Sequence, residues 1–433
     1  MSGETNGIHM TYKTGGYSKV TFSGNTAYDS GLQGVVLNAM IDGSVAGNLV
    51  HDTGLYTGSG ETWGPVALWS AGSSHSTFEN NEVYRSFDGA TGYDASGIDV
   101  DWDNSYITVQ SNYLHDNQGA GIEVLSSDHT SVRYNRIYNN AGQTNMPAQI
   151  SLNDYSDGAV HGITNASIAH NVVVLSSPDS IALSTYGTPG YTWGGNAYSN
   201  NYVVFSNSTD AYDLEVDGVG AMASANDNIF YSDTGKGFEG AIDGTTETSL
   251  AKWQSYTGLD LQSSEVSGSS VSQEASDFTP QGHTTNQWTY QYSENGESSF
   301  VNMKWNEPTE LWKGNESKCA IGPGWEQPGG SSCDAVLVWS ANGAGMATVA
   351  ADSPISVQTG CGGSGVELRL LKNGIQIWPS SGWESLGNGG SYTFSPLTTS
   401  VSAKDQLQFV IRHAGSNNDC DATYWIPTVV FSP

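Results

Sequence analysis

The most constraining feature of this sequence is a short phrase whose eight copies all begin within the first 230 residues. Each copy begins with asparagine, has an apolar residue at its third position and often has Tyr or His at its fourth. The copies begin at Asn25, Asn48, Asn81, Asn112, Asn135, Asn171, Asn201 and Asn228. Successive copies are separated by 23 to 36 residues, a period typical of architectures in which each repeat is one structural unit.

The segments between the repeated asparagines hold short runs of β-branched and aromatic residues separated by Gly, Asn and Ser, without helical periodicity. This pattern predicts short strands joined by turns. We therefore predict an all-β fold, namely a right-handed parallel β-helix with one coil per repeat. Because such coils stack equivalent residues, we expect the asparagines to form a ladder whose side-chain amides satisfy main-chain groups, without a chemical role.

The last copy of the asparagine phrase begins at Asn228, and the sequence pattern changes beyond about residue 265. We expect the β-helix over residues 1–265, and a Ser-, Glu- and Gln-rich stretch over 266–286 indicates a linker. Residues 287–433 are rich in Trp and contain alternating segments such as VELRLLKNGIQIW and QLQFVIRH. These segments predict an antiparallel β-sandwich of the jelly-roll kind.

All four cysteines, Cys319, Cys333, Cys361 and Cys420, lie in this C-terminal region. An even number of cysteines in one β-rich segment indicates two disulfides and an oxidising compartment. Three pairings are possible, and we expect Cys319–Cys333 together with Cys361–Cys420. The alternative is four reduced cysteines buried in the core.

Charge and composition exclude several classes of partner. The chain has only 14 Lys and Arg against 44 Asp and Glu, a formal net charge of −30. Nucleic acids and anionic membranes both require basic surfaces, so we expect neither partner. No apolar run reaches transmembrane length, and the N-terminus lacks a signal-peptide core, so we expect that any signal has been removed. We expect a secreted, monomeric protein, and sequons at Asn165, Asn207 and Asn315 fit secretion.

A second phrase recurs farther along each coil, in the forms GPVALWS, SGIDVDWD, AGIEVLS, AQISLND and SIALST. Because side chains alternate across a strand, we align the aliphatic residues of these phrases as interior positions. The two interior columns are then Val66, Ile98, Ile122, Ile150, Ile181 and Leu68, Val100, Val124, Leu152, Leu183. The two outward columns are Ala67, Asp99, Glu123, Ser151, Ala182 and Trp69, Asp101, Leu125, Asn153, Ser184.

Three carboxylates, Asp99, Asp101 and Glu123, share one exposed patch in this alignment. Asp99 and Glu123 are cross-rung neighbours about 4.8 Å apart, and Asp101 lies diagonal to Glu123 at roughly 8 Å. Like charges this close raise at least one pKa, and separated pKa values suit an acid and base pair. Glycosidases use carboxyl separations of about 5–5.5 Å or about 6.5–9.5 Å, and the patch offers both. We therefore assign these three residues as candidate catalytic groups.

Residues around the patch are candidates for substrate binding: Trp69, Asp103, His115, Asn153, Asp154 and Tyr155. The outward ring of Trp69 beside Asp101 is suited to stacking on a sugar face. His115 occupies the repeated Tyr/His position, so a stacked structural ring is its alternative role. The carboxylates Asp99, Asp101 and Glu123 also permit two other interpretations, a solvated acidic ladder or a Ca²⁺ site. No cofactor is predicted to be required.

The segment SGIDVDWDNSYITVQSNYLHDNQGAGIEV (96–124) resembles secreted right-handed parallel β-helix proteins of the polygalacturonase-like and related glycosidase families. The resemblance covers about residues 30–240. It implies that carboxylates on adjacent rungs, here Asp99, Asp101 and Glu123, serve as acid, base or nucleophile. The chain lacks the paired DD rung, the GHG and the RIK of true polygalacturonases, which argues against pectic acid as the substrate.

The segment LKNGIQIWPSSGW (371–383), with DQLQFVIRHAG and DATYWIPTV beyond it, resembles a β-sandwich module appended to bacterial and fungal carbohydrate-active enzymes. This resemblance implies glycan binding by the C-terminal region. Trp378, Trp383 and Trp425 are candidates either for glycan contacts or for the core of that domain.

The sequence therefore predicts a secreted glycoside hydrolase that acts on a neutral or weakly charged polysaccharide. Asp101 and Asp99 would supply the nucleophile or base, Glu123 the general acid, and Asp103 and Asp154 would tune them. A Ca²⁺-assisted polysaccharide lyase or uronate epimerase is the main alternative, although the Lys and Arg of the helical region lie away from the carboxylate rungs. A non-catalytic glycan-binding or surface protein is the third possibility.

Overall fold

The chain divides into two compact units, residues 1–268 and 269–433, each with its own hydrophobic core. The computed structural model describes residues 7–56, 64–88, 94–141, 148–154, 162–175, 180–188, 190–205, 212–216, 221–232, 237–267, 270–278, 287–294, 299–306, 308–309, 311–330, 332–351, 353–359, 362–415 and 417–433.

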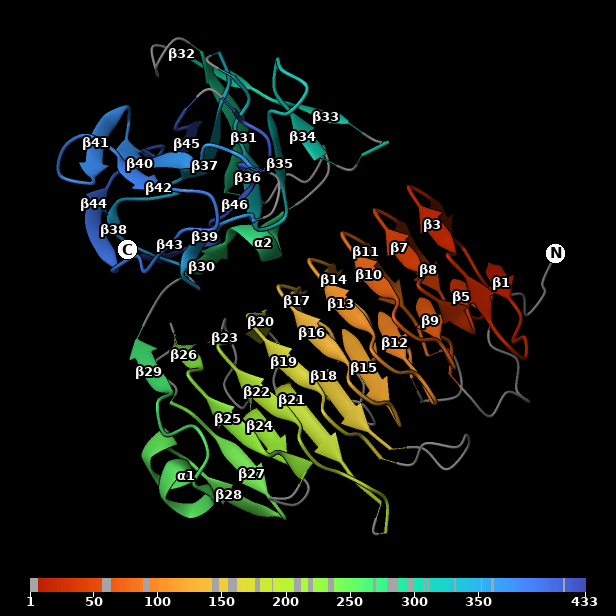
Figure 1. Cartoon of the computed structure of the whole chain (residues 1–433). Coiled ribbons are helices and arrows are strands. Elements are labelled where there is room, and N and C mark those ends of the chain that lie inside the picture. Colours follow the sequence, from red (N-terminus) through yellow and green to blue (C-terminus); the bar gives the residue numbers. More distant parts are fainter. Residues whose placement is uncertain are drawn as a thin grey trace. The chain divides into compact units, whose positions relative to one another are not determined.

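The first unit is a parallel β-helix, as predicted, in which each coil contributes one strand to each of three sheets (Figure 1). The first sheet contains, in spatial order, β1 (Ile8–Met10), β5 (Val35–Leu37), β9 (Leu68–Ser70), β12 (Ile98–Val100), β15 (Ile122–Leu125), β18 (Ala148–Asn153), β21 (Ile181–Tyr186), β24 (Tyr212–Val216), β27 (Gly240–Ile242) and β28 (Thr245–Glu247). Only the β27–β28 pair of this sheet is antiparallel within the described residues.

The second and third sheets follow the first along every coil. The second sheet contains β3 (Thr21–Ser23), β7 (Ser44–Ala46), β10 (Thr77–Glu79), β13 (Thr108–Gln110), β16 (Ser131–Arg133), β19 (Ser167–Ala169), β22 (Ala197–Ser199) and β25 (Ser224–Asn226). The third sheet contains β4 (Thr26–Tyr28), β8 (Leu49–Thr53), β11 (Glu82–Ser86), β14 (Tyr113–His115), β17 (Arg136–Tyr138), β20 (Val172–Leu175), β23 (Tyr202–Phe205), β26 (Ile229–Ser232) and β29 (Ser264–Ser267). A short pair, β2 (Tyr17–Ser18) and β6 (Met40–Ile41), completes the unit.

The repeated asparagines lie at the turn between the second and third sheets, and they form the predicted ladder. The main-chain N and the Nδ2 of Asn81 donate to Oδ1 of Asn112 at 3.0 and 2.9 Å. The same two bonds link each ladder asparagine to the next, from Asn25 to Asn228. The residue before every ladder asparagine has a positive φ, which turns the chain between the two sheets.

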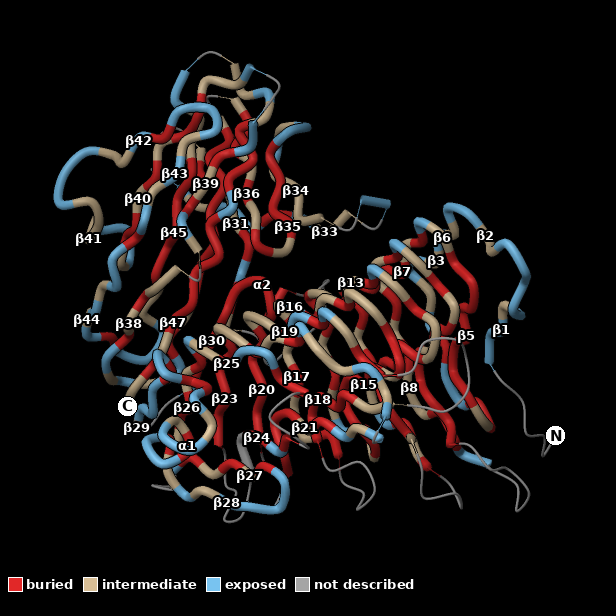
Figure 2. The backbone as a smooth tube through the Cα atoms, turned by 60° about the horizontal axis from the view of Figure 1, so that its bottom comes forward, coloured by how far each residue is buried: buried red, intermediate tan, exposed pale blue. Residues whose placement is uncertain are grey.

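The interior of the β-helix is mainly apolar, and a helix packs at its C-terminal end. Ile98, Val100, Ile122 and Val124 are among the fully buried core residues, and buried positions run along the stacked strands in Figure 2. Helix α1 (Leu250–Thr257) follows β28 and buries Trp253 against the last coils.

The second unit consists of three antiparallel sheets around a second core. A four-stranded sheet contains β30 (Ser270–Gln273), β47 (Pro427–Ser432), β38 (Gly345–Ala351) and β44 (Leu397–Val401). One seven-stranded sheet contains β32 (Ser299–Asn302), β31 (Trp288–Glu294), β37 (Asp334–Ser340), β45 (Gln406–His413), β40 (Val366–Lys372), β41 (Ile375–Trp378) and β42 (Glu384–Leu386). The other contains β33 (Lys304–Asn306), β34 (Leu311–Lys313), β35 (Ala320–Gly322), β36 (Trp325–Gln327), β46 (Thr423–Tyr424), β39 (Ile355–Val357) and β43 (Ser391–Tyr392).

The start of this unit differs from the linker that the sequence predicted over 266–286. Strand β30 pairs with β47 in the four-stranded sheet, and it is followed by the buried short helix α2 (Glu274–Asp277). Residues 279–286 of the predicted linker lie outside the described residues. A polar composition therefore does not prevent Ser270–Gln273 from forming a strand, because its main-chain groups pair with an existing sheet edge.

The three tryptophans singled out in the C-terminal sequence have different surroundings. Trp425 is fully buried in the core, so it cannot offer its face to a glycan. Trp378 packs against that core, with its ring 5.9 Å from the ring of Trp425. Trp383 lies against the guanidinium groups of Arg369 and Arg412, at 3.8 and 3.9 Å from its ring centre.

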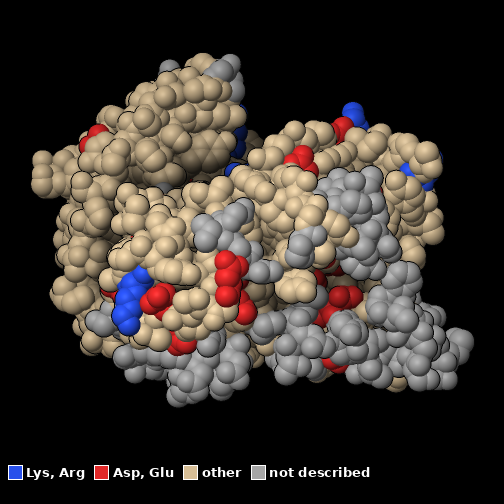
Figure 3. Space-filling view, turned by 90° about the horizontal axis from the view of Figure 1, so that it is seen from below, with Lys and Arg blue, Asp and Glu red and all other residues tan. Residues whose placement is uncertain are grey.

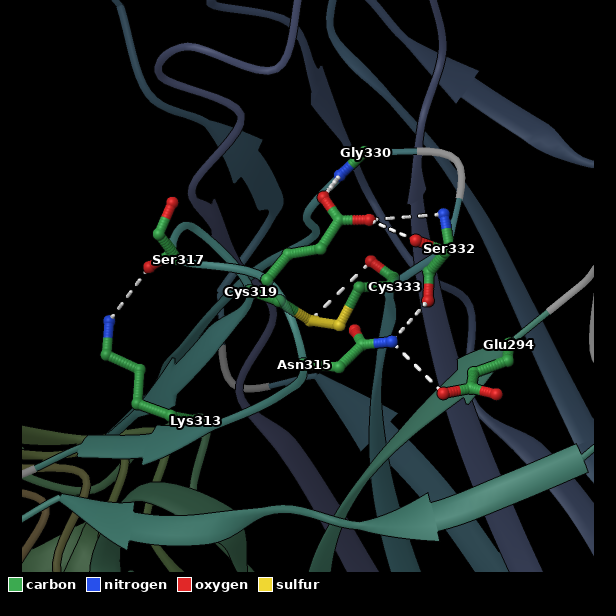
Figure 4. Close-up of a disulfide and its surroundings, with 9 residues drawn as sticks. Glu294, Lys313, Asn315, Ser317, Cys319, Gly330, Ser332 and Cys333 are labelled. Atoms are coloured by element: carbon green, nitrogen blue, oxygen red, sulfur yellow. Dashed lines mark hydrogen bonds between the residues drawn. A yellow bond between two sulfur atoms is a disulfide. The ribbon is translucent and has the colours of Figure 1, made fainter.

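The predicted disulfide between Cys319 and Cys333 is present, with Cα atoms 6.1 Å apart. It crosses a polar loop in which Asn315 donates to Glu294 and to the carbonyl of Ser332 (Figure 4). Cys420 is also disulfide-bonded, and its predicted partner Cys361 lies outside the described residues.

No helix in the described part of the chain has the length and apolar character needed to cross a bilayer.

Candidate functional site

The predicted pairing of Asp99 with Glu123 is confirmed. In the β12–β15 pair, Ile98, Asp99 and Val100 lie opposite Ile122, Glu123 and Val124. The four aliphatic side chains enter the core, so the alternation along each strand directs the two carboxyl groups away from it. Register partners in neighbouring strands lie about 4.8 Å apart, which makes the two acids direct cross-rung neighbours.

The predicted register of the preceding coil is wrong by two residues. Trp69 lies opposite Asp99, where Ala67 was expected. The reason is that Ser70, not an aliphatic residue, fills the interior position opposite Val100; it is fully buried, and its Oγ bonds to Oγ of Ser73 at 2.8 Å. An alignment that admits only aliphatic residues to the interior therefore cannot place Ser70, which is an inward-facing serine with a hydrogen-bonded hydroxyl.

The same error affects the coil after β18. Ser184, rather than Ala182, lies opposite Ser151, and Tyr186 lies opposite Asn153. Here Thr185 fills the interior position opposite Leu152. The β15–β18 pair between these two shifts has the predicted register.

Glu123 is held by hydrogen bonds to both of its carboxyl oxygens. Oγ of Ser96 donates to Oε2 at 2.8 Å, and Nδ2 of Asn153 donates to Oε1 at 3.0 Å. Ser96 precedes β12 and Asn153 ends β18, so the two donors come from the coils on either side of Glu123. The side chain is fully buried.

Asp101 is also held at both oxygens. Nε1 of Trp69 donates to Oδ2 at 2.7 Å, and the main-chain N of Trp102 donates to Oδ1 at 2.7 Å. The expected proximity of Trp69 to Asp101 is thus confirmed, although the indole approaches diagonally from the position opposite Asp99.

Asp99 differs from these two carboxyls because its Oδ1 has no hydrogen-bond partner within the described residues. The side chain is only 3% exposed. A buried acceptor without a donor is unusual in native structures and calls for an explanation. A carboxyl in this position is stabilised by holding a proton or by receiving a donor from a bound ligand.

Asp94 is a fourth carboxyl of the cluster, and it was not among the site residues predicted from the sequence. Its Oδ2 accepts the main-chain N–H of Gly64 at 3.0 Å, and its charge raises the pKa values of Asp99, Asp101 and Glu123. Its φ of 58° lies in the left-handed region, where Asp and Asn are enriched. The signal that could have identified it is its position in the same YDASGIDVD run as Asp99.

The carboxyls of this cluster are buried, whereas the sequence predicted an exposed patch. Burial is the largest cause of the raised pKa of each group. It raises the pKa of Asp94 to about 6, of Asp101 to about 7 and of Glu123 to about 8. Burial together with the charges of Asp101, Glu123 and Asp94 raises the pKa of Asp99 well above its usual range. A solvated acidic ladder is therefore excluded.

Basic side chains are scarce around this cluster. None of the ten strands of the first sheet contains Lys or Arg. In the space-filling view from below, acidic groups are more frequent than basic ones, and acidic atoms lie in a hollow of the surface (Figure 3). This face therefore presents a negative field, which disfavours polyanionic ligands.

The remaining predicted site residues differ in their partners. Asp103 acts on the pKa of Asp101 and therefore lies near it. Asp154 instead accepts hydrogen bonds from Oγ1 of Thr188 at 2.7 Å and Nε1 of Trp193 at 3.1 Å. Tyr155 lies outside the described residues.

His115 is not part of the carboxyl cluster, so its assignment to the site is corrected. It lies on β14 in the third sheet, where its ring stacks on Tyr84 at 4.8 Å. Its Nδ1 bonds to Asp116 at 2.8 Å, and its Nε2 bonds to Glu82 at 3.2 Å. The alternative role of a stacked structural ring is thus the one observed.

The carboxyl cluster does not form an evident calcium cage. Within the described residues, no group of three or more His, Cys, Asp or Glu side chains is arranged to hold a metal ion. Both oxygens of Glu123 and both of Asp101 already accept hydrogen bonds from fixed donors. The arrangement is better suited to proton transfer, because carboxyls whose pKa values differ lie side by side.

The family described as right-handed β-helix region matches residues 2–246, more than half of the chain. No curated protein matches the sequence.

Several solved structures show some similarity over most of the chain. The enzymatically active domain of tailspike protein 2 from bacteriophage CBA120 is 11% identical, over 97% of this chain and 72% of that chain, with a TM-score of 0.23. The Dettilon tailspike protein is 10% identical, over 96% and 81%, with a TM-score of 0.28. A tailspike protein of Acinetobacter baumannii bacteriophage Fri1, a capsular polysaccharide depolymerase, is 9% identical, over 93% and 63%, with a TM-score of 0.20.

Proposed function

The chain belongs to the right-handed β-helix family, and from this premise we propose that it is a secreted glycoside hydrolase acting on a neutral or weakly charged polysaccharide. The observation that carries the proposal is the contrast within the carboxyl cluster. Asp101 and Glu123 each accept two hydrogen bonds from fixed donors, whereas Asp99 has a buried oxygen without a partner in the described residues. Acid and base catalysis needs neighbouring carboxyls whose pKa values differ in this way.

Asp99 is the general acid in this proposal, which revises the role that the sequence suggested for Glu123. Hydrogen-bond donors stabilise the ionised form of a carboxyl, and their absence favours the protonated form. Asp99 therefore retains its proton and can donate it to the oxygen of the glycosidic bond. Glu123 lies opposite Asp99 and is fully buried, so it acts as a positioning residue whose charge raises the pKa of Asp99.

Asp101 is the proposed base or nucleophile. The N–H groups of Trp69 and Trp102 lower its pKa against the effect of burial, which keeps it ionised at a lower pH than Asp99. It is also the most exposed of the three, at 8%. In the reaction, Asp101 either takes a proton from the attacking water or attacks the anomeric carbon itself, while Asp99 protonates the leaving oxygen.

The class of substrate follows from the charges of the first sheet. A uronate polymer needs cations for its carboxylates, and no strand of this sheet carries one. A neutral glycan needs only hydrogen bonds and apolar contacts, which the partly exposed Trp69 and Ser184 can supply. The disulfide Cys319–Cys333 supports the secreted location that this substrate implies.

A polysaccharide panel tests the proposal. Neutral and acidic polysaccharides are incubated with the protein, and new reducing ends and the ultraviolet absorbance of unsaturated uronates are followed together. Reducing ends without that absorbance support hydrolysis. Appearance of the chromophore would overturn the proposal in favour of a lyase. Retention on a polymer without either product would replace it with a glycan-binding role.

Two variants assign the activity to the cluster. Asp99→Asn and Asp101→Asn should each reduce hydrolysis strongly, whereas the same change in the exposed turn residue Asp227 should leave the rate unchanged. Asparagine is tolerated at the positive φ of Asp227, so this control makes no new strain. Full activity in either cluster variant would contradict the assignment.

A further inference from the structure

Two carboxyl groups of the second unit are buried without adequate partners. Glu274 opens helix α2, and Glu326 is the central residue of β36; both side chains are fully buried. Within the described residues, Oε1 of Glu274 and both oxygens of Glu326 have no hydrogen-bond partner. The main chain of Leu337 lies near the Glu326 carboxyl and lowers its pKa, although burial outweighs this effect.

The local fold brings these two carboxyls to the same turn. The main-chain N of Gly324, in the turn between β35 and β36, donates to Oε2 of Glu274 at 2.8 Å. Glu326 lies two residues beyond Gly324, on β36, so the turn that bonds to Glu274 leads directly into the strand that carries Glu326. A Cβ placed on Gly324 would lie 3.4 Å from Cβ of Ala275, which shows how closely the turn packs against α2.

Within the described residues, the charges that act on the pair are all negative. Asp277 raises the pKa of Glu274, and Glu274 in turn raises the pKa of Glu326. Burial is the largest cause in both cases, and it raises the pKa of Glu274 to about 8. No basic side chain in the described part of the chain contributes to either shift.

A buried carboxyl in such surroundings is stabilised by a proton or by a cation. A single proton can partner at most two of these three carboxyl oxygens, one as its donor and one as its acceptor, so within the described residues it leaves at least one oxygen without a partner. A divalent cation satisfies several carboxylate oxygens together. Hard cations such as Ca²⁺ bind carboxylate and main-chain carbonyl oxygens in flexible shells of six to eight ligands.

We propose that Glu274 and Glu326 are ligands of a structural Ca²⁺ ion that ties α2 to the β35–β36 turn. No group of three acidic, His or Cys side chains in the described residues forms a cage, so main-chain carbonyls and water complete the shell. The site is separate from the carboxyl cluster on the β-helix and does not depend on the proposed hydrolysis.

Thermal unfolding of the full chain tests the proposal. After treatment with EDTA, addition of Ca²⁺ at a hundredfold excess over its Kd should raise the unfolding temperature of the second unit by roughly 5–10 °C. Most tryptophans lie in this unit, so tryptophan fluorescence reports its transition. Tb³⁺ should replace Ca²⁺ and emit through energy transfer from Trp325, the neighbour of Glu326.

Glu326→Gln should abolish the Ca²⁺-dependent shift and the Tb³⁺ emission while leaving the metal-free unfolding temperature unchanged or higher, since it removes a buried charge. If this variant does not fold, Glu274→Gln serves as the second test with the same expected losses. The control Glu384→Gln, on β42, should retain the full shift. Absence of any shift and emission in the native chain, or their persistence in both variants, would overturn the proposal.

The catalytic variant Asp99→Asn separates this site from the one on the β-helix. It should lose hydrolysis but retain the full Ca²⁺ shift. A shift that disappears in Asp99→Asn and persists in Glu326→Gln would place the cation on the β-helix, against the proposal.

Discussion

Two columns of polar side chains are stacked on the same coils of the β-helix, one of asparagines and one of carboxylates. Their hydrogen-bonding groups are satisfied in different ways. Each ladder asparagine both donates and accepts, so that Asn112 makes five hydrogen bonds through its main-chain N and side-chain amide. A carboxylate can only accept. Asp99 and Glu123 therefore cannot satisfy each other across the same rung spacing, and Glu123 takes its donors from Ser96 and Asn153.

This difference separates scaffold from candidate site. Stacking amides adds cooperative hydrogen bonds and stabilises the coil, whereas stacking buried carboxyls raises their pKa values and costs stability. A protein retains such a destabilising column where the raised pKa values serve a reaction. Exchanging an amide for an acid in one column, and an acid for an amide in the other, tests the comparison directly.

The largest effect is expected for Asp99→Asn. This change removes the proton that the proposed mechanism delivers to the leaving oxygen, so hydrolysis should fall by about 10²–10⁴-fold. The unfolding free energy at neutral pH should stay the same or rise, because a buried carboxyl with an unpartnered oxygen is replaced by a neutral amide. Reducing-end assays and denaturant unfolding measure the two effects. A loss of activity that parallels a loss of stability would make Asp99 structural.

The reverse exchange, Asn112→Asp, should destabilise the β-helix by about 3–5 kcal/mol. The side chain is fully buried, and its Nδ2 donates to Phe78 and Asn135 at 3.0 Å; a carboxylate oxygen would face both acceptors. The same exchange at Asn25, the half-buried first member of the ladder, is the matched control and should cost less. Equal costs in denaturant unfolding would mean that burial does not govern the ladder.

The asparagine ladder was predictable because it repeats: eight copies of one phrase fix both the period and the turn. The Asp99–Glu123 pairing followed from the same register, because aliphatic residues occupy the interior on both strands. The prediction failed where polar residues face inward, since Ser70 and Thr185 shift the neighbouring coils by two positions. Single residues that break an apolar pattern carry no periodic signal.

Burial of the carboxyl cluster could not be predicted from the sequence either. An outward position on a strand predicts exposure, but the exposure of Asp99 depends on what the coils place over it, which no local pattern encodes. Asp94 was missed for a related reason: it lies in a turn, and its membership of the cluster depends on tertiary proximity. His115 matched the repeat, and the repeat correctly indicated its stacked structural role.

The pH dependence of stability should distinguish the two columns as well. The pKa values of Asp94, Asp101 and Glu123 are raised to about 6, 7 and 8 in the folded state, so the folded chain binds more protons than the unfolded chain between about pH 4 and pH 8. The cluster therefore makes stability fall as pH rises through this window. Denaturant unfolding at several pH values should show this fall, and a smaller one in Asp99→Asn. An identical slope in the variant would contradict a shared titration.

The smallest effect, and the one that best resolves the roles within the cluster, is expected for Trp69→Phe. Its indole N–H donates to Oδ2 of Asp101 at 2.7 Å and lowers the pKa of that carboxyl. Phenylalanine retains most of the ring but removes the donor, so the pKa of Asp101 should rise by about one unit. If Asp101 is the base, the acidic limb of the kcat profile moves to higher pH by that amount, while the basic limb set by Asp99 stays in place.

Trp193→Phe supplies the matched control for this prediction, because it also removes an indole donor from a carboxyl, Asp154, three coils away from Trp69 on the same unit. Its pH profile should coincide with that of the native chain. Movement of the basic limb in Trp69→Phe would assign the proton to Asp101 instead and exchange the two roles. A pH profile unchanged in both variants would mean that the indole of Trp69 does not act on the group that titrates during catalysis. The difference in pKa between the carboxyls would then arise from Glu123 and its two donors alone.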